Sequence, residues 1–119
     1  MSQLKIGLRD NQTRFAPGQE ITGAAGWDFP APPQSVEARL LWFTRGVAIE
    51  DSAVVQTVRF ENPKAAEARP FAFRLPEMPH SFTGRLASLF WAVEVVAQPA
   101  KESARAEFVM GPGGRAISL

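Results

Sequence analysis

The chain has 119 residues, 45% hydrophobic and 21% charged, a composition typical of one folded domain and unlike that of a disordered or collagen-like chain. Thirteen basic against twelve acidic residues leave a net charge of +1, too small to hold a phosphate backbone, so we expect no nucleic-acid partner. The absence of cysteine excludes disulfides, thiolate nucleophiles and sulfur-based zinc sites, and a single histidine leaves an imidazole metal site short of ligands, so we expect no cofactor.

Hydrophobic residues recur at every second position in most of the chain, a period typical of half-buried strands rather than helices. In chain order, the alternation predicts strands over residues 4–9, 19–29, 36–44, 54–61, 71–75, 88–95 and 104–110, separated by turn-forming or proline-rich segments. Two windows, residues 64–69 and 101–107, have the composition of a helical turn and stay open as such, although both are shorter than a stable isolated helix.

Seven short strands separated by turns predict an all-β fold, an immunoglobulin-like antiparallel β-sandwich over residues 1–110. Residues 111–119 are predicted to be a flexible C-terminal tail, because Gly111-Pro112-Gly113-Gly114 disfavours any regular element. The side chains predicted to face the interior share one parity in each strand: Leu4, Ile6, Leu8, Ile21, Ala25, Trp27, Phe29, Val36, Ala38, Leu40, Trp42, Val54, Val58, Phe60, Phe71, Phe73, Leu75, Leu89, Trp91, Val93, Val95, Ala104, Ala106, Phe108 and Met110.

Two clusters of residues carry a resemblance to a known family. The first is Pro17-Gly18-x-x-Ile21-x-Gly23. The second, residues 71–84, reads Phe-x-Phe-x-Leu-Pro-x-x-Pro-x-Ser-Phe-x-Gly and precedes the alternating strand that contains Trp91. Together they resemble the arrestin fold, as found in arrestins, in the retromer subunit related to them and in bacterial sporulation-control proteins. The order of the clusters matches the first domain of that family over most of the chain.

The sequence also departs from the family. Arrestins join two such sandwiches, and their receptor binding depends on the pair, whereas this sequence predicts one sandwich. It contains no tyrosine, so the proline-rich tyrosine motifs with which some relatives recruit ubiquitin ligases are absent. His80 stands where relatives often carry another proline, and its role is open. The resemblance therefore implies the fold but not the two-domain mechanism.

Four apolar residues have the wrong parity for their strands: Leu41, Phe43, Phe90 and Val96 lie opposite the predicted inward rows. If the two strands that carry them are neighbours, these side chains form a patch of a few hundred Å², the size at which exposed apolar surface indicates a partner. The alternatives are that a β-bulge reverses the alternation, or that a loop or the tail covers the patch. We take the four residues as a candidate protein interface.

Candidate catalytic and metal sites have less support, and we predict none. Ser81 beside His80 is the one serine–histidine pair close in sequence, but adjacent residues of an extended segment point apart. The acidic turn at residues 50–52, Glu-Asp-Ser, supplies too few oxygen ligands for calcium. Residues 111–115 have the glycine content of a phosphate-binding loop but lack its lysine.

Two functions remain open. The first is a non-enzymatic, arrestin-like protein interaction or scaffold module that binds by an edge strand or by the outward apolar patch, with a second copy of the chain as one candidate partner. The alternative is a sandwich that binds a small ligand or carbohydrate and uses Trp27, Trp42 or Trp91 as a stacking surface. All three tryptophans share the inward parity, which favours the interaction module.

The sequence also bears on location. The first residues contain no apolar core of signal-peptide length, and the longest strongly apolar segment, residues 86–97, is interrupted by Ser88 and Glu94. We therefore expect no transmembrane segment and a cytoplasmic location. The excess of arginine over lysine and the abundant alanine indicate a GC-rich bacterial source.

Overall fold

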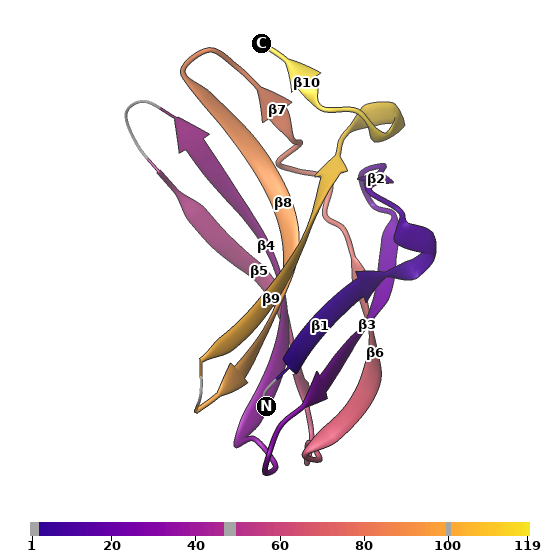
Figure 1. Ribbon diagram of the computed structural model, residues 1–119. Helices are drawn as coiled ribbons and strands as arrows, with labels where there is room; N and C mark the ends of the chain where they lie inside the picture. The colour runs from indigo at the N-terminus through magenta and orange to yellow at the C-terminus, as the bar shows by residue number, and fades with distance from the viewer. Residues whose placement is uncertain (1–2, 47–49, 100) are drawn as a thin grey trace.

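Ten strands and two 3₁₀ turns make up the computed structural model, which describes residues 3–46, 50–99 and 101–119 (Figure 1). The turns are Arg9–Asn11 and Pro112–Gly114. The strands are β1 (Gln3–Leu8), β2 (Arg14–Phe15), β3 (Glu20–Asp28), β4 (Ser35–Gly46), β5 (Ser52–Phe60), β6 (Ala66–Arg74), β7 (Phe82–Thr83), β8 (Ala87–Gln98), β9 (Glu102–Met110) and β10 (Ile117–Ser118).

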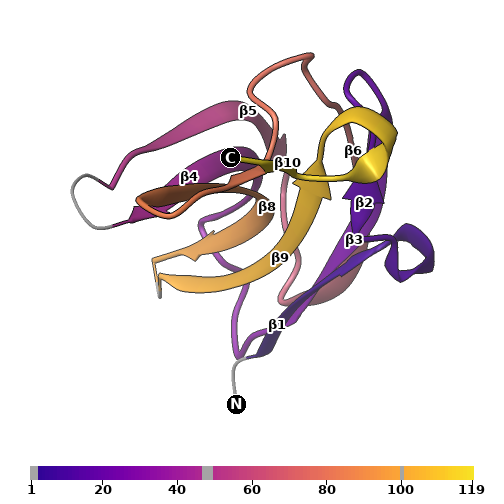
Figure 2. The same cartoon turned by 90° about the horizontal axis from the view of Figure 1, so that it is seen from above.

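The strands form two sheets that face each other, which confirms the predicted all-β sandwich (Figure 2). The smaller sheet has the order β1-β3-β6 and is antiparallel throughout. In the larger sheet, β4 lies between β5 and β8, and the other side of β8 pairs with β9 and then with β7. The short strands β2 and β10 add in parallel to β9 and β7. No helix in the described ranges is long and apolar enough to cross a membrane.

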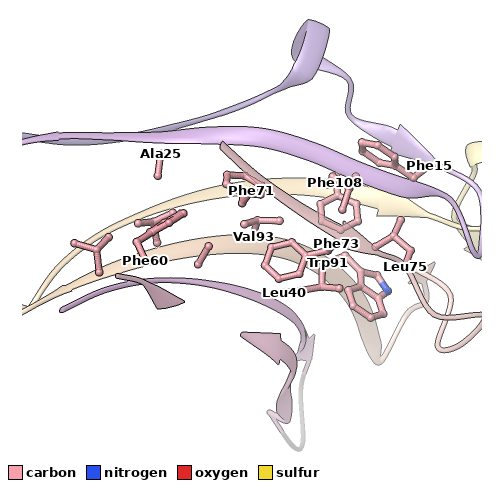
Figure 3. Close-up of a cluster of buried hydrophobic side chains, with 14 of the residues drawn as sticks. Phe15, Ala25, Leu40, Phe60, Phe71, Phe73, Leu75, Trp91, Val93 and Phe108 are labelled. Carbon is pink, nitrogen blue, oxygen red and sulfur yellow. The ribbon is translucent and has the colours of Figure 1, made fainter. Parts of the chain in front are cut away.

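The core lies between the sheets and is built from the inward rows of both (Figure 3). Two indoles are buried there with their N–H groups satisfied, since Trp27 donates to the Lys64 carbonyl and Trp91 to the Pro79 carbonyl, each at 2.8 Å. The largest fully buried side chains are Trp91, Phe73, Ile21, Leu40, Leu75, Met110, Val36, Val93 and Val95. Every one of them except Ile21 lies in β4 or later, and six of the nine lie in the second half of the chain.

Both windows with a helical composition are mostly strand. β6 begins at Ala66, five residues before the predicted start at Phe71, and β9 begins at Glu102. Each segment pairs along its length with a neighbour, β6 with β3 and β9 with β8. A ladder with a formed strand satisfies the backbone groups that a single isolated turn leaves free, so tertiary pairing overrides local composition.

A β-bulge in β5 reverses part of the predicted alternation. Leu41 of β4 lies opposite Val54, but Leu40 lies opposite Gln56, so Val55 is an extra residue in β5. Val54 therefore shares the outward face of Leu41, and its side chain is 54% exposed. The prediction that Val54 faces the interior with Phe60 is wrong for this reason.

The segment after Met110 contains regular structure, and the prediction that it has none is wrong. Gly113 and Gly114 take φ values of +64° and +72°, which L side chains rarely adopt, and they turn the chain back toward β7. The N–H groups of Ile117 and Leu119 then donate to the carbonyls of Ser81 and Thr83, both at 2.9 Å. The flexibility of this tail stays a prediction.

Candidate functional site

The outward face of the larger sheet carries an apolar cluster of Leu41, Phe43, Phe90 and Ala92, here called the outer cluster. β4 and β8 are antiparallel neighbours in a register that places Phe43 opposite Phe90. Their rings stack with centroids 5.4 Å apart and planes inclined by 26°. The structure thus brings together three of the four residues predicted as an interface, and it does so through the neighbouring strands that the prediction required.

Two arginine side chains lie over the outer cluster. The guanidinium carbon of Arg45 is 5.1 Å from the centroid of Phe43 and 5.5 Å from that of Phe90, and Arg105 of β9 is 4.9 Å from Phe43. A guanidinium at this distance from a ring face is a cation–π contact. Leu41 and Phe43 are only 6% and 8% exposed. Part of the cover over Phe43 and Phe90 therefore comes from arginine side chains of the same sheet face.

Val96 lies on the same face but outside the outer cluster. It is opposite Glu37 on one side and Ser103 on the other, and it is half-buried. The ion pair between Arg105 and Glu94, 3.0 Å long, stands between it and Phe90. A polar strip therefore divides the predicted patch.

The charges on this face are unevenly paired. Arg39 is bound to Glu37 and Arg105 to Glu94, both at 3.0 Å, whereas Arg45 forms no ion pair within the described part of the chain. Next to Arg45 the surface has a shallow hollow of about 500 Å³, lined by Phe43, Thr44, Arg45, Glu50, Asp51, Ser52 and Arg105. The tip of the adjoining loop, residues 47–49, lies outside the described residues.

The serine and histidine weighed as a catalytic pair are not hydrogen-bonded to each other in the described part of the chain. The hydroxyl of buried Ser81 accepts the N–H of Met110 at 3.0 Å and so joins two segments of the fold. Nδ1 of His80 is buried without a hydrogen-bond partner. Across residues 3–46, 50–99 and 101–119, no group of three or more histidine, aspartate or glutamate side chains could hold a metal ion.

The tryptophans weighed as a stacking surface belong to the interior. Trp27 is 4% exposed and Trp91 is fully buried. Trp42 is half-buried and packs against the core, because it lies opposite Trp91 on the inward face of the larger sheet. None of the three indoles lies on the outward face of a sheet, where a flat ligand would stack.

Two residues of this surface escape prediction from the sequence: Arg105 and Val54. Arg45, by contrast, stands two residues after Phe43, so strand parity alone places it on the same face. Arg105 is found only once the pairing of β9 with β8 is known. Val54 requires the bulge in β5, which depends on pairing with β4.

Comparison with solved structures supports the fold. The chain is similar to the sporulation control protein Spo0M from Bacillus subtilis, with a TM-score of 0.69 and 15% identity over 93% of this chain and 49% of that one. It is also similar to part of a β-glucosidase from Listeria innocua, with a TM-score of 0.51 and 14% identity over all of this chain and 16% of the enzyme. No protein-family model and no curated protein sequence matches.

The resemblance to the arrestin-like fold of sporulation-control proteins is confirmed as a likeness of fold. This chain spans about half the length of the Spo0M structure that it matches. At 15% identity the likeness carries the arrangement of strands and no function.

Proposed function

We propose that the chain is a non-enzymatic protein interaction module of arrestin-like fold and that it binds a partner protein through the outward face of its larger sheet. The observation that carries the proposal is the stacked pair Phe43 and Phe90 beneath two arginines. The outward face of an antiparallel sheet is ordinarily polar. Aromatic and arginine side chains together are the residue types most enriched in protein interfaces.

The arginine cover is compatible with binding. An exposed cation–π contact contributes only about 0.5–1 kcal/mol, so a guanidinium can turn toward a carbonyl or carboxylate of a partner at small cost. Arg45 is exposed and forms no ion pair among the described residues, so it is available for such a contact. When Arg45 turns away, the ring of Phe90 becomes accessible as an anchor.

The proposal is tested by Phe90→Ser and Val96→Ser, which change half-buried residues of β8 and leave the core rows intact. A tagged wild-type chain is used to capture partners from cells of the source organism, and chemical cross-links map the contact. Phe90→Ser should abolish capture, and Val96→Ser should weaken it less, because Val96 lies beyond the Glu94–Arg105 strip.

Met78→Ser is the matched control, since Met78 is 65% exposed but lies in the connection between β6 and β7. This variant should capture the same partner as the wild-type chain. Capture that survives Phe90→Ser, or cross-links that map to the smaller sheet, would contradict the proposal.

A further inference from the structure

The edge strands of the two sheets, here called margin strands, differ in how well they are protected against pairing with a further strand. An unpaired margin strand presents free N–H and C=O groups to any extended chain. On one side of the sandwich, β1 runs alongside β9, and β2 pairs with the end of β9 (Figure 1). The adjoining strands β7 and β10 have two residues each, too few to hold a partner. The two long strands on this side, β1 and β9, thus lie against each other rather than against open solvent.

On the other side, the margin strand of the smaller sheet is β6, and a proline interrupts it. At the two ends of the β3–β6 ladder, Leu75 donates to the Gln19 carbonyl and Phe29 donates to the Ala65 carbonyl. Odd-numbered residues of β6 therefore bond to β3, and even-numbered residues direct their backbone groups away from β3, toward the free margin of the sheet. Pro70 occupies one of these even-numbered positions, where it has no N–H to offer an incoming strand.

The margin strand of the larger sheet, β5, has no such protection (Figure 2). It is nine residues long, and residues 52–58 contain no charged side chain and no proline. Val54 and Val55 are 54% and 40% exposed. A long, uncharged margin rich in β-branched residues is the kind of edge that natural proteins normally blunt, so its retention indicates a use.

The ladder between β4 and β5 shows which backbone groups are free. The N–H of Thr44 donates to the Asp51 carbonyl at 2.8 Å, and β4 pairs with β8 without a break, so even-numbered residues of β4 bond to β5. The N–H of Ser52 instead bonds to the side chain of Asp51, as expected for a group directed away from β4. The residues of β5 whose backbone groups point to the free margin are therefore Ser52, Val54, Thr57 and Arg59.

These four positions can pair with the same four positions of a second copy of the chain. A two-fold axis normal to the sheet places Ser52 opposite Arg59 of the second copy and Val54 opposite Thr57 of the second copy, and the reverse pairs follow by symmetry. Each pair joins backbone groups that point to the margin, and the two bulges meet at the axis. The Val–Thr pairs are β-branched on both sides, and no pair opposes two like charges.

The charges at the ends of β5 also complement each other. The carboxylate of Asp51 lies at the free margin, because its Oδ1 accepts the Ser52 N–H at 2.8 Å. Arg59 is exposed and has no ion-pair partner in the ranges that the structure describes. In the antiparallel arrangement, Arg59 of the second copy arrives opposite Ser52 and next to Asp51. This contact forms twice, which favours a second copy over an arbitrary extended segment.

We propose that β5 pairs antiparallel with β5 of a second copy, so that the two larger sheets become one continuous sheet. Because the axis is normal to that sheet, both outer clusters lie on the same side and present a bivalent surface to the partner. Only the role of the bivalent surface in binding a partner rests on the proposed function, and the dimer itself does not. An interface of one strand from each copy is small, so the dimer should be weak and concentration-dependent.

Sedimentation equilibrium of the whole chain from micromolar to millimolar concentration tests the dimer. The wild-type chain should pass from monomer to dimer over this range. Thr57→Pro removes one N–H at the free margin and leaves the β4 ladder intact, as Pro70 does in β6, so it should stay monomeric at every concentration. Thr57→Ala keeps the N–H and should dimerise within about twofold of the wild-type dissociation constant, consistent with a surface change. Circular dichroism checks that both variants are folded.

A charge exchange tests the register. Asp51→Arg and Arg59→Asp should each weaken the dimer several-fold, and the double variant should recover most of the loss. A wild-type chain that is monomeric at millimolar concentration, a Thr57→Pro variant that dimerises normally, or a double variant without recovery would each overturn the proposal. Phe90→Ser should dimerise like the wild-type chain, so loss of partner capture and loss of the dimer are separate results.

Discussion

The two sheets both turn apolar residues outward, but with side chains of very different size. The outward face of the smaller sheet is lined by small residues, where Gly7, Ala24 and Pro70 lie side by side across its three strands. A shallow, mostly apolar hollow of about 760 Å³ runs over them. The outward face of the larger sheet instead carries the stacked rings of Phe43 and Phe90 beneath arginines.

The difference teaches that apolar composition alone does not mark a binding surface. A face of glycine, alanine and proline has no long side chain that a partner could enclose in a pocket, so each contact buries little area. An aromatic pair supplies large rigid anchors and interacts with cations. These grounds support the proposal that a partner binds the larger sheet, and the following predictions test how far the two faces differ.

The largest expected effect concerns Phe43. Phe43→Ala removes a nearly buried ring from the outer cluster and should lower the free energy of unfolding by about 3 kcal/mol. Ala24→Ser, on the outward face of the smaller sheet, should change it by less than about 0.5 kcal/mol. Urea unfolding followed by circular dichroism measures both. A loss below about 1 kcal/mol for Phe43→Ala is the size of an ordinary surface change. It would mean that residues on the two outward faces contribute equally little to stability.

The second prediction separates two glycines of the smaller sheet. A Cβ at Gly23 would lie 2.3 Å from the Gly7 carbonyl oxygen and 2.8 Å from the ring of Phe71, so Gly23→Ala should destabilise the fold by about 2 kcal/mol. A Cβ at Gly7 meets nothing within 4 Å, so Gly7→Ala should stabilise it by about 0.5 kcal/mol. Thermal melts give both values. Equal changes in stability for Gly23→Ala and Gly7→Ala would show that close packing does not require glycine at residue 23.

The third prediction compares one arginine from each outward face. Arg105→Ala removes the contact with Phe43 and the ion pair with Glu94, and should cost about 1 kcal/mol of stability at low salt. Arg74→Ala, on the smaller sheet, removes a hydrogen bond to the Gly18 carbonyl and should cost about 0.5 kcal/mol. High salt should reduce the first loss, because it screens the ion pair. If salt leaves the stability loss of Arg105→Ala unchanged, the ion pair with Glu94 does not contribute to the stability of the fold.

The strands could be predicted from the sequence wherever one face of a strand is buried and the other is exposed to solvent. In β8, Leu89, Trp91, Val93 and Val95 are all buried, as their alternation predicts. The same rule identified Phe43 and Phe90 as outward-facing, because their opposite parity survives in the continuous β4–β8 register. Parity therefore predicts the face of a residue, provided that no bulge intervenes.

The remaining features depend on partners distant in sequence. Nothing in the run Val54-Val55-Gln56 distinguishes a bulged strand from a regular one, because the extra residue is defined by pairing with β4. The first half of β6 lacks large apolar residues at its inward positions, which hold Glu67 and Arg69 instead. Their charges are satisfied by each other and by loop carbonyls, a solution that only the folded chain provides.

That ion pair carries the smallest prediction and contrasts with those of the larger sheet, because it lies on the inner side of the smaller sheet. The Arg69 Nε donates to Glu67 Oε1 at 2.9 Å, and the Lys64 N–H donates to Glu67 Oε2 at 2.6 Å. The hydrogen bond from Arg69, followed by that from Lys64, lowers the pKa of Glu67 below its ordinary value of 4.5.

Because the pKa of Glu67 is lower in the folded chain than in the unfolded one, its contribution to stability is present above pH 4.5 and is lost as the pH falls through the lowered value. Glu67→Gln should therefore lose stability at neutral pH and show a shallower decline below pH 4.5. Glu107→Gln, an exposed change on β9, should keep the wild-type slope. Urea midpoints measured between neutral and acidic pH decide the matter, and parallel curves for Glu67→Gln and the wild-type chain would mean that the acid sensitivity of the fold arises elsewhere.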